Sequence, residues 1–383
     1  MRIILGAALS IPPYSPGRAW HRLHYLLGLR KLGHEVYFVE ELHPEACVDR
    51  NGAKVRLEHS INRDLFRDTL EPFGLMENAC LIYGNGEATF GLSRDSLVAV
   101  SETADLLINW SGHIGSDFIL ERVGRRIFVD QDPVLLQAWR EEYGMDFNLN
   151  RHDVFITTAL NIGTPYTSIP GLGFRWHHVL PPVVLEYWPF QIDPSCGRFT
   201  TVATLSPFGD VYYRGERYGT KYDELRRLAE LPRRTKSDFE IALKYYREEE
   251  PALEFLKGCG WVISDAGTID SLTEYQRYLG RSRGEIGIVQ SAQLKARSGW
   301  FSDRWSHYLA TGRPVLAAST GFERWIPTGR GLLTFNTIDE AVEGIAVINA
   351  DYAAHCRAAR GFAEEHLDAG KVLPKMLEAC SAN

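Results

Sequence analysis

Residues 308–322 read YLATGRPVLAASTGF, an order of residue types that predicts a helix, a turn and a strand. Small and apolar residues end the expected helix, and Gly312 stands where a helix C-terminus favours glycine. Pro314 then opens a short apolar run through Ser319, which predicts a buried strand. A helix followed by a short turn and a buried strand is typical of α/β proteins.

The same alternation of helical patterns and short apolar runs extends along the chain on both sides of this stretch. Such alternation predicts parallel sheets covered by helices. In the first unit, a strand is followed by a helix over 16–32, with Gly33 at its expected end. The expected strands are 2–9, 35–39, 81–84, 105–110, 126–130 and 152–157 in the first half, and 199–205, 239–243, 261–265, 285–290, 314–319 and 331–335 in the second.

The chain has 383 residues, a length typical of two domains. Residues 183–197 lack helical periodicity and contain two prolines and a glycine, which predicts a hinge. We expect an N-terminal Rossmann-like domain over 1–185, a hinge over 186–197, a C-terminal Rossmann-like domain over 198–350, and C-terminal helices over 351–383 that pack back toward the N-terminal domain. The expected fold class is α/β, with two doubly wound sheets facing a central cleft.

The composition argues against several classes of protein. The net charge is −7 and the arginine pairs lie among acidic residues, so we expect no nucleic-acid partner. Six cysteines occur without a C-x-x-C pair, which fits reduced thiols better than disulfides or a zinc site. No apolar run approaches the roughly 18 residues that cross a membrane. Residues 3–9 fit a buried first strand better than an export signal, so we expect a cytoplasmic protein without an integral membrane segment.

Small and basic residues precede the helix expected at 302–311. Ser298, Gly299 and Ser302 would let a ligand approach backbone N–H groups at the helix start, where unpaired donors and the helix dipole bind anions. Lys295 and Arg297 add positive charge beside them. This pattern predicts a diphosphate site. The alternative is that Ser302 only caps the helix.

Two segments together resemble the glycosyltransferases of the GT-B fold. Residues 308–322 are similar to the A-x-G-x-P-V-x-A…G segment of their C-terminal domain, and LGHEV at 32–36 is similar to the start of their N-terminal domain. The resemblance implies a donor site in the C-terminal domain, with Lys221 and Asp303 among its residues. It also implies that the loop Thr320-Gly321-Phe322 offers backbone amides to the donor sugar.

The resemblance further implies what the protein binds and does. A sugar would pass from an NDP-sugar to an unidentified acceptor, a small molecule or a glycan, as in natural-product or glycan biosynthesis. The acceptor would bind in the N-terminal domain. The NDP-sugar would be a co-substrate, with no cofactor and no metal required. A homodimer is left open.

The sequence departs from the retaining branch of these enzymes. That branch usually has two glutamates eight residues apart, which bind the donor sugar and the ribose. Aligned on Gly312, these positions hold Gly299 and His307 in this chain. Asp303 or Glu323 would have to supply a replacement carboxylate. Retaining and inverting stereochemistry both stay open.

A sugar acceptor must lose a proton as it attacks the anomeric carbon, so a histidine or a carboxylate should face the cleft. His113 and Asp132 each follow an expected strand, and His21 lies one helical turn beyond the first loop. These three residues are the candidate catalytic groups. The alternatives are that His113 is merely hydrogen-bonded in its loop and that Asp132, which precedes Pro133, caps a helix.

Several other readings compete with sugar transfer by a GT-B enzyme. Asp130-Gln131-Asp132 has the form of the metal-binding D-x-D of the other glycosyltransferase fold, but it lies in the first domain, away from the phosphate pattern. A nucleotide-dependent oxidoreductase would need G-x-G-x-x-G after the first strand, where residues 6–13 read GAALSIPP. A nucleotide-sugar epimerase of GT-B-like fold and a non-catalytic two-lobe nucleotide-sugar-binding protein remain alternatives.

Overall fold

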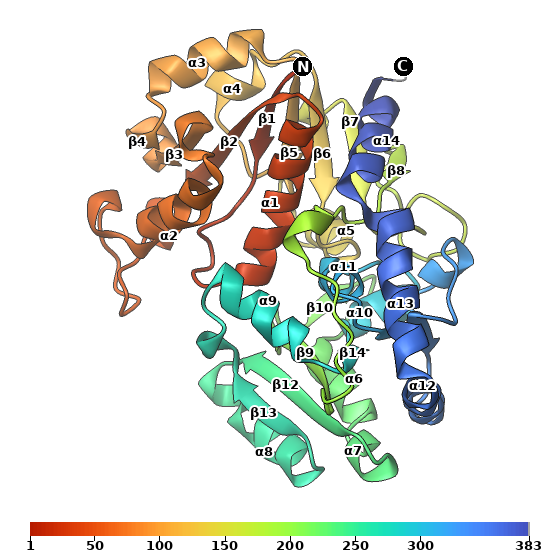
Figure 1. The fold of residues 1–383 in the computed structure, drawn as a ribbon. Coiled ribbons are helices and arrows are strands. Elements are labelled where there is room, and N and C mark those ends of the chain that lie inside the picture. The colour runs from red at the N-terminus through yellow and green to blue at the C-terminus, as the bar shows by residue number, and fades with distance from the viewer. Residues whose placement is uncertain (382–383) are drawn as a thin grey trace.

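A computed structural model describes residues 1–381 as two large sheets with helices packed against them (Figure 1). The expected fold class, α/β with two doubly wound sheets, is confirmed. The first sheet is formed by residues before the hinge and the second by residues after it. A separate two-stranded hairpin, β10–β11, belongs to neither sheet.

The first sheet has the strand order β4-β3-β2-β1-β5-β6-β7-β8. All neighbouring strands run parallel except β3 and β4. Residues 3–5 of the central strand are fully buried, as expected for a parallel strand covered on both faces. The strands are β1 (Arg2–Gly6), β2 (Glu35–Leu42), β3 (Ala79–Tyr83), β4 (Ala88–Gly91), β5 (Leu106–Trp110), β6 (Arg126–Asp130), β7 (Val154–Thr157) and β8 (Trp176–His178).

The second sheet is parallel throughout, in the order β13-β12-β9-β14-β15-β16. Its chain order reverses between β9 and β14, which is the switch point where open α/β sheets bind ligands. The strands are β9 (Arg198–Thr204), β12 (Asp238–Lys244), β13 (Val262–Asp265), β14 (Gly284–Gly287), β15 (Val315–Ala318) and β16 (Leu332–Phe335), and the hairpin consists of β10 (Val211–Tyr213) and β11 (Glu216–Tyr218).

Helices connect the strands and cover the sheets. None of the helices within residues 1–381 has the length and apolarity needed to cross a membrane. The helices are α1 (Pro16–Lys31), α2 (Ile61–Leu70), α3 (Arg94–Thr103), α4 (Asp117–Leu120), α5 (Leu135–Glu141), α6 (Lys221–Arg227), α7 (Leu231–Arg234), α8 (Glu250–Gly258), α9 (Leu272–Gly280), α10 (Ser291–Ala296), α11 (Asp303–Ala310), α12 (Ile338–Ala350), α13 (Tyr352–Phe362) and α14 (Ala369–Ser381), with a π-helical turn at Ala363–Leu367.

The stretch 308–322 forms the helix, turn and strand that its residues predict. Helix α11 ends before Gly312, which adopts a positive φ of 75° that favours glycine at a helix end. Strand β15 begins one residue after Pro314, and all four of its residues are buried. The sequence does not predict β4, β8, β10 or β11, which are only three or four residues long.

The last helix returns to the first domain. In Figure 1, α14 lies beside α1, and both chain ends are at the top of the molecule. A Cβ added to Gly28 of α1 would lie 2.5 Å from Cδ1 of Leu373 and 3.0 Å from Cβ of Ala369. Val183 also pairs with Asp368 in an isolated parallel bridge. The chain therefore passes between the two domains twice.

Candidate functional site

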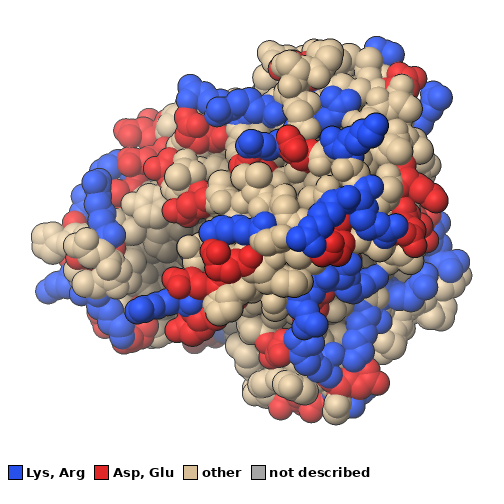
Figure 2. Space-filling model, turned by 90° about the horizontal axis from the view of Figure 1, so that it is seen from below, with Lys and Arg blue, Asp and Glu red and all other residues tan. Residues whose placement is uncertain are grey.

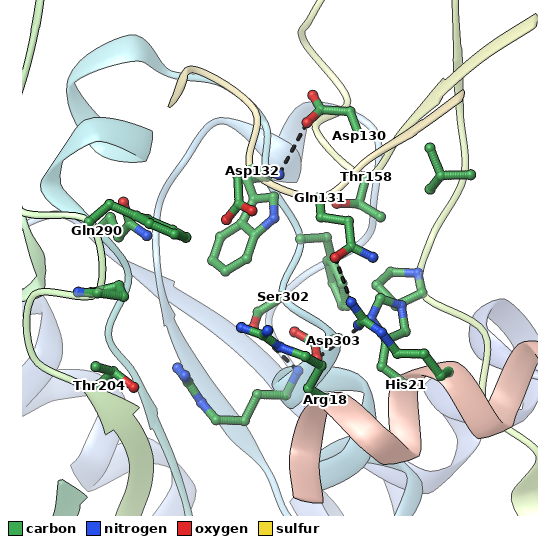
Figure 3. Close-up of a pocket in the computed structure, with 18 of the residues that line it drawn as sticks. Arg18, His21, Asp130, Gln131, Asp132, Thr158, Thr204, Gln290, Ser302 and Asp303 are labelled. Carbon is green, nitrogen blue, oxygen red and sulfur yellow. Dashed lines mark hydrogen bonds and ion pairs between the residues drawn. The ribbon is translucent and has the colours of Figure 1, made fainter. Parts of the chain in front are cut away.

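A cavity of about 230 Å³ opens between the carboxyl ends of the two sheets (Figure 3). Helix α1 and the loops after β6 and β7 line it from the first domain. The loop after β9 and the starts of α6 and α11 line it from the second. The polar lining includes Arg18, His21, Arg22, Asp130, Gln131, Asp132, Thr158, Thr204, Lys221, Gln290, Ser302, Asp303 and Arg304. Two of the three candidate catalytic residues, His21 and Asp132, are among them.

Two aspartates at the end of β6 have different environments. Asp130 accepts a hydrogen bond from the backbone N–H of Asp132 at 3.1 Å. Burial, and next the charge of Asp132, raises the pKa of Asp130 well above its ordinary value. Burial also raises the pKa of Asp132, but Arg18, Lys221 and Arg22 oppose that rise. These cations therefore favour the ionised form of Asp132.

The loop that carries Asp132 is held from several sides. Arg22 Nη2 donates to Gln131 Oε1 at 2.7 Å, and Gln293 Nε2 of the second domain donates to the Pro133 carbonyl at 2.7 Å. Val134 has a φ of 77°, which is rare for a β-branched residue, and its N–H donates to Gln137 Oε1 at 2.7 Å. Strained backbone of this kind is concentrated at functional sites, where the surrounding structure maintains the strain.

The same contacts answer whether Asp132 is only a helix cap. The cap residue of α5 is Val134, whose N–H is bound by Gln137. The carboxylate of Asp132 makes no hydrogen bond within residues 1–381 and lines the cavity instead. A fixed carboxylate that lines a cleft is the arrangement that proton transfer needs.

His21 and Asp303 meet across the domain boundary. His21 Nδ1 lies 3.7 Å from Asp303 Oδ2, and Nε2 of the same ring is buried without a hydrogen-bond partner in the described chain. Burial lowers the pKa of His21 to about 3, so the imidazole is neutral at neutral pH. Burial alone would raise the pKa of Asp303, but the nearby His21, His307 and Arg304 lower it overall.

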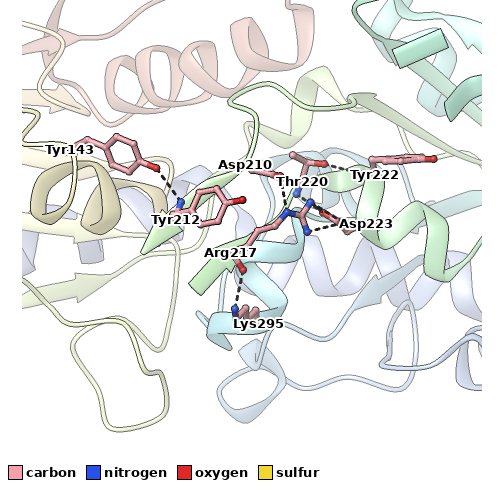
Figure 4. A network of polar contacts seen from close by, with 8 residues as sticks. All are labelled: Tyr143, Asp210, Tyr212, Arg217, Thr220, Tyr222, Asp223 and Lys295. Carbon is pink, nitrogen blue, oxygen red and sulfur yellow. Dashed lines mark hydrogen bonds and ion pairs between the residues drawn. The ribbon is translucent and has the colours of Figure 1, made fainter. Parts of the chain in front are cut away.

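Lys221 is the first residue of α6 and lines the cavity from the second domain. The hydroxyl of Thr220 accepts from the Tyr222 N–H at 3.2 Å, and Asp223 Oδ2 accepts from the Thr220 N–H at 2.9 Å. Arg217 pairs with Asp223, as Figure 4 shows. These contacts fix the start of α6 and hence the backbone of Lys221.

The start of α11 completes the second-domain side. Ser302 caps the helix, because its Oγ accepts from the Arg304 N–H at 3.3 Å, and it also lines the cavity. The capping and ligand-site readings of Ser302 are therefore compatible. Arg304 forms a buried ion pair with Glu285 and donates to the carbonyls of Val202 and Ile288. Its charge is already neutralised inside the protein.

His113 lies outside this cavity. Its imidazole is half-buried, and Nε2 accepts a hydrogen bond from the backbone N–H of Glu41 at 3.0 Å. Burial lowers the pKa of His113 to about 4. The turn after β5 directs the ring to the end of the neighbouring strand β2, so His113 does not line the cavity.

The two cations expected beside the phosphate pattern also lie elsewhere. Lys295 pairs with Glu216 on the surface, and its Nζ donates to the carbonyl of Arg217 at 2.9 Å. Arg297 follows α10 with a φ of 48°, in the left-handed conformation of a helix C-terminus. Neither residue lines the cavity between the sheets. The end of α10 directs both away from the start of α11.

The small residues of the expected phosphate loop contact protein instead. Backbone N–H groups of Leu160 and Asn161 donate to the carbonyls of Gly299 and Ser298 at 3.0 and 2.9 Å. Asn161 Nδ2 donates to the Arg297 carbonyl at 2.8 Å. The loop of Thr320, Gly321 and Phe322 contacts the same residues, because the Gly299 N–H donates to the Thr320 carbonyl at 2.8 Å. The glycines admit the first domain's backbone rather than a ligand.

Both positions of the expected glutamate pair thus serve domain packing. Gly299 adjoins Asn161, and His307 is buried, stacked on Trp188 of the hinge with ring centroids 4.8 Å apart. Glu323 accepts a hydrogen bond from Ser319 and does not line the cavity. Of the two expected replacement carboxylates, only Asp303 reaches the cavity.

Gly299→Ala is expected to lower the free energy of unfolding by on the order of 2 kcal/mol. Gly299 has a φ of 74°, and an added Cβ would lie 2.7 Å from the backbone nitrogen of Asn161. Chemical unfolding of the variant measures the loss. Gly52→Ala is the matched control, because Gly52 has a φ of 81° with open space around it. Equal losses in both variants would mean that the domain contact contributes nothing.

The β10–β11 hairpin joins the two sides of the cavity. The Tyr212 N–H donates to the hydroxyl of Tyr143 at 3.1 Å (Figure 4), and the Arg214 N–H donates to Glu142 at 2.7 Å. The hydroxyl of Tyr213 donates to Glu141. The hairpin directly precedes Lys221 in the chain. The residues that accept its hydrogen bonds lie at the end of α5, the helix that follows Asp132. The second domain is therefore tied to the first beside the cavity.

One carboxylate oxygen of the D-x-D pair is engaged within the protein, because Asp130 Oδ1 accepts the N–H of Asp132. Within residues 1–381, no group of three or more His, Cys, Asp or Glu side chains could hold a metal ion.

Comparison with known proteins identifies the architecture. No protein-family model and no curated protein matches this sequence. Among solved structures, an alpha-glucosyltransferase in complex with UDP and a 13-mer DNA containing a central A:G mismatch matches with a TM-score of 0.64 and 14% identity, over 100% of both chains. Anabaena HepE in complex with UDP and glucose matches with a TM-score of 0.61 and 11% identity, over 100% of this chain and 99% of that one.

The chain has the GT-B fold. A third structure of this fold, AviGT4, a glycosyltransferase involved in avilamycin A biosynthesis, matches with a TM-score of 0.53 and 14% identity, over 100% of this chain and 97% of that one. The resemblance seen in residues 308–322 is thus confirmed at the level of the fold. In a GT-B fold the cavity described above lies between the two Rossmann-like domains.

Proposed function

We propose that this protein transfers a sugar from an NDP-sugar to a hydroxyl group of an acceptor. The observation that carries the proposal is the cavity in which Lys221 and a helix start on one domain face the carboxylate of Asp132 on the other. Nucleotide-sugar chemistry needs both features, since a diphosphate leaves while an acceptor gives up a proton.

The donor would bind on the second domain. The ammonium of Lys221 supplies a positive charge, and the start of α11 at Ser302 and Asp303 supplies unpaired backbone N–H groups. Both would stabilise the charge that develops on the leaving diphosphate. Asp303 would bind sugar or ribose hydroxyls, in place of the carboxylate absent at His307. No cofactor and no metal enters this proposal.

The acceptor would approach from the first domain. Asp132 is the group proposed to take the acceptor's proton, because its loop is fixed and its carboxylate lines the cavity without a hydrogen bond within residues 1–381. The neutral imidazole of His21, which faces Asp303, is the second candidate group for taking this proton. On the face that Figure 2 displays, Lys and Arg are interleaved with Asp and Glu, which favours a small molecule or a glycan over a nucleic acid.

Calorimetry with UDP, GDP, ADP and dTDP tests donor binding, and UDP comes first because two of the matched proteins were solved with it. The NDP-sugars of the base that binds are then incubated with a panel of hydroxylated acceptors. Mass spectrometry should detect a glycosylated product. Turnover of the NDP-sugar into an isomer without any acceptor would instead indicate an epimerase. Binding without any turnover would indicate a binding protein.

The affinity for UDP should fall as the pH rises through about 8. Burial, followed by the charge of Arg304, lowers the pKa of Lys221 to about 8, and a diphosphate binds the protonated amine. The free protein loses this proton above pH 8, so affinity should fall about fivefold between pH 8 and pH 9. Calorimetry across this range measures the fall. In Lys221→Arg the guanidinium stays charged, and an unchanged fall there would exclude Lys221 as its cause.

A further inference from the structure

We propose that Arg18, a residue of the first domain, binds the β-phosphate of the donor that the second domain holds. This inference rests on the proposed function and adds a residue to its donor site. The second domain alone would then lack one residue of the donor site.

Arg18 lies where two cavities meet. The first, of about 230 Å³, reaches Asp132, and the second, of about 200 Å³, reaches Ala266 and Ile269 beyond β13. Arg18, Thr204, Asp303 and Arg304 line both. An NDP-sugar has a sugar at one end, a nucleoside at the other and a diphosphate between them. A donor with its sugar near Asp132 and its nucleoside in the second cavity would have its diphosphate at this junction.

The guanidinium of Arg18 is anchored but not neutralised. Its Nη1 donates to the carbonyl of Ile11 at 2.7 Å, which fixes the side chain at the start of α1. No carboxylate forms an ion pair with Arg18 in the described part of the chain. Figure 3 shows Arg18 beside Asp303, near the Ser302 end of α11. Its remaining N–H groups are available for a phosphate, which arginine can bind at two oxygens.

At the junction of the two cavities, the second domain offers little free positive charge. Arg304 is the other cation at the junction, but Glu285 and two backbone carbonyls use its guanidinium. Lys221 remains as a single charge against the several charges of a diphosphate. Arg18 lines the first cavity together with Asp132, so it reaches the side of the junction where the sugar would lie. The β-phosphate, which carries the sugar, is therefore its partner.

Calorimetry with UDP and UMP tests the inference on Arg18→Ala, Arg18→Lys and the control Arg30→Ala. If the wild type prefers another base, the diphosphate and monophosphate of that base replace UDP and UMP. Arg30 lies on the same helix and donates to the carbonyls of Phe73 and Gly74, away from both cavities. We expect Arg18→Ala to weaken UDP binding by about 10- to 100-fold and UMP binding by less than about threefold. Arg18→Lys should recover part of the loss, and Arg30→Ala should match the wild type.

Equal losses for UDP and UMP would overturn the inference, because they are expected if Arg18 only supports the Ile11 loop. An unchanged UDP affinity in Arg18→Ala would overturn it as well, while leaving the proposed function intact. If the wild type binds no nucleoside diphosphate at all, the proposed function and this inference both fail. Thermal unfolding of each variant identifies a loss that comes from misfolding, and Arg18→Lys then decides the case.

Discussion

Asp132→Asn should reduce the rate of sugar transfer by about 10²- to 10⁴-fold while the protein still folds and binds UDP. The substitution preserves the size of the side chain but removes the charge that would accept the acceptor's proton. The loop around it keeps its hydrogen bonds, because Gln131, Pro133 and Val134 rather than the Asp132 side chain make them. Steady-state kinetics with the acceptor found in the panel measures the loss in kcat.

Asp130→Asn is the matched control for this prediction. Burial raises the pKa of Asp130 well above its ordinary value, and an amide oxygen can still accept the N–H of Asp132. We expect transfer to stay within about tenfold of the wild type, the range of one neutral hydrogen bond. A full rate in Asp132→Asn would exclude it as the base. Equal losses in the two variants would indicate that the loop geometry, not the charge, matters.

Lys221→Ala should weaken UDP binding by about 10- to 100-fold and lower kcat/KM at least as much. Among the described second-domain residues that line the cavity, Lys221 is the cation that Glu285 does not pair with. In a buried site a charge-assisted hydrogen bond to phosphate is stronger than a neutral one. Calorimetry gives the affinity, and initial rates with the NDP-sugar give kcat/KM.

Lys295→Ala is the control, since the sequence pattern puts Lys295 in the same site whereas the structure puts it on the surface with Glu216. Its UDP affinity should remain within about threefold of the wild type, as for other exposed ion pairs. A loss equal to that of Lys221→Ala would restore Lys295 to the donor site. A wild-type affinity in Lys221→Ala would remove the lysine from it.

Much of the fold could be predicted because parallel sheets carry a strong local signal. Strands buried on both faces, such as 126–130 and 315–318, appear as apolar runs, and Gly312 marks a helix end by its own backbone preference. Asp132 and Ser302 were also accessible to sequence reasoning, since they follow strand ends or start helices. In doubly wound sheets those places converge on one cleft.

The rest of the site could not be predicted, because it depends on what each side chain meets in space. Glycine at 299 and 321 indicates a close approach of some group to the backbone, but not that the group is Asn161 of the other domain. Lys295 is near the site in sequence and directed away from it. Arg18 faces the cleft only because α1 and the second domain meet there, which no local pattern records.

The return of α14 to α1 has a consequence for how the chain is made. Domains generally fold as they emerge from the ribosome, the N-terminal one first. Here the surface of α1 at Gly28 is covered by Ala369 and Leu373, which are synthesised after the strands of both sheets. The first domain must therefore wait, with an apolar surface open, until the second has been translated. A nascent chain stalled before residue 369 would expose that surface to chaperones.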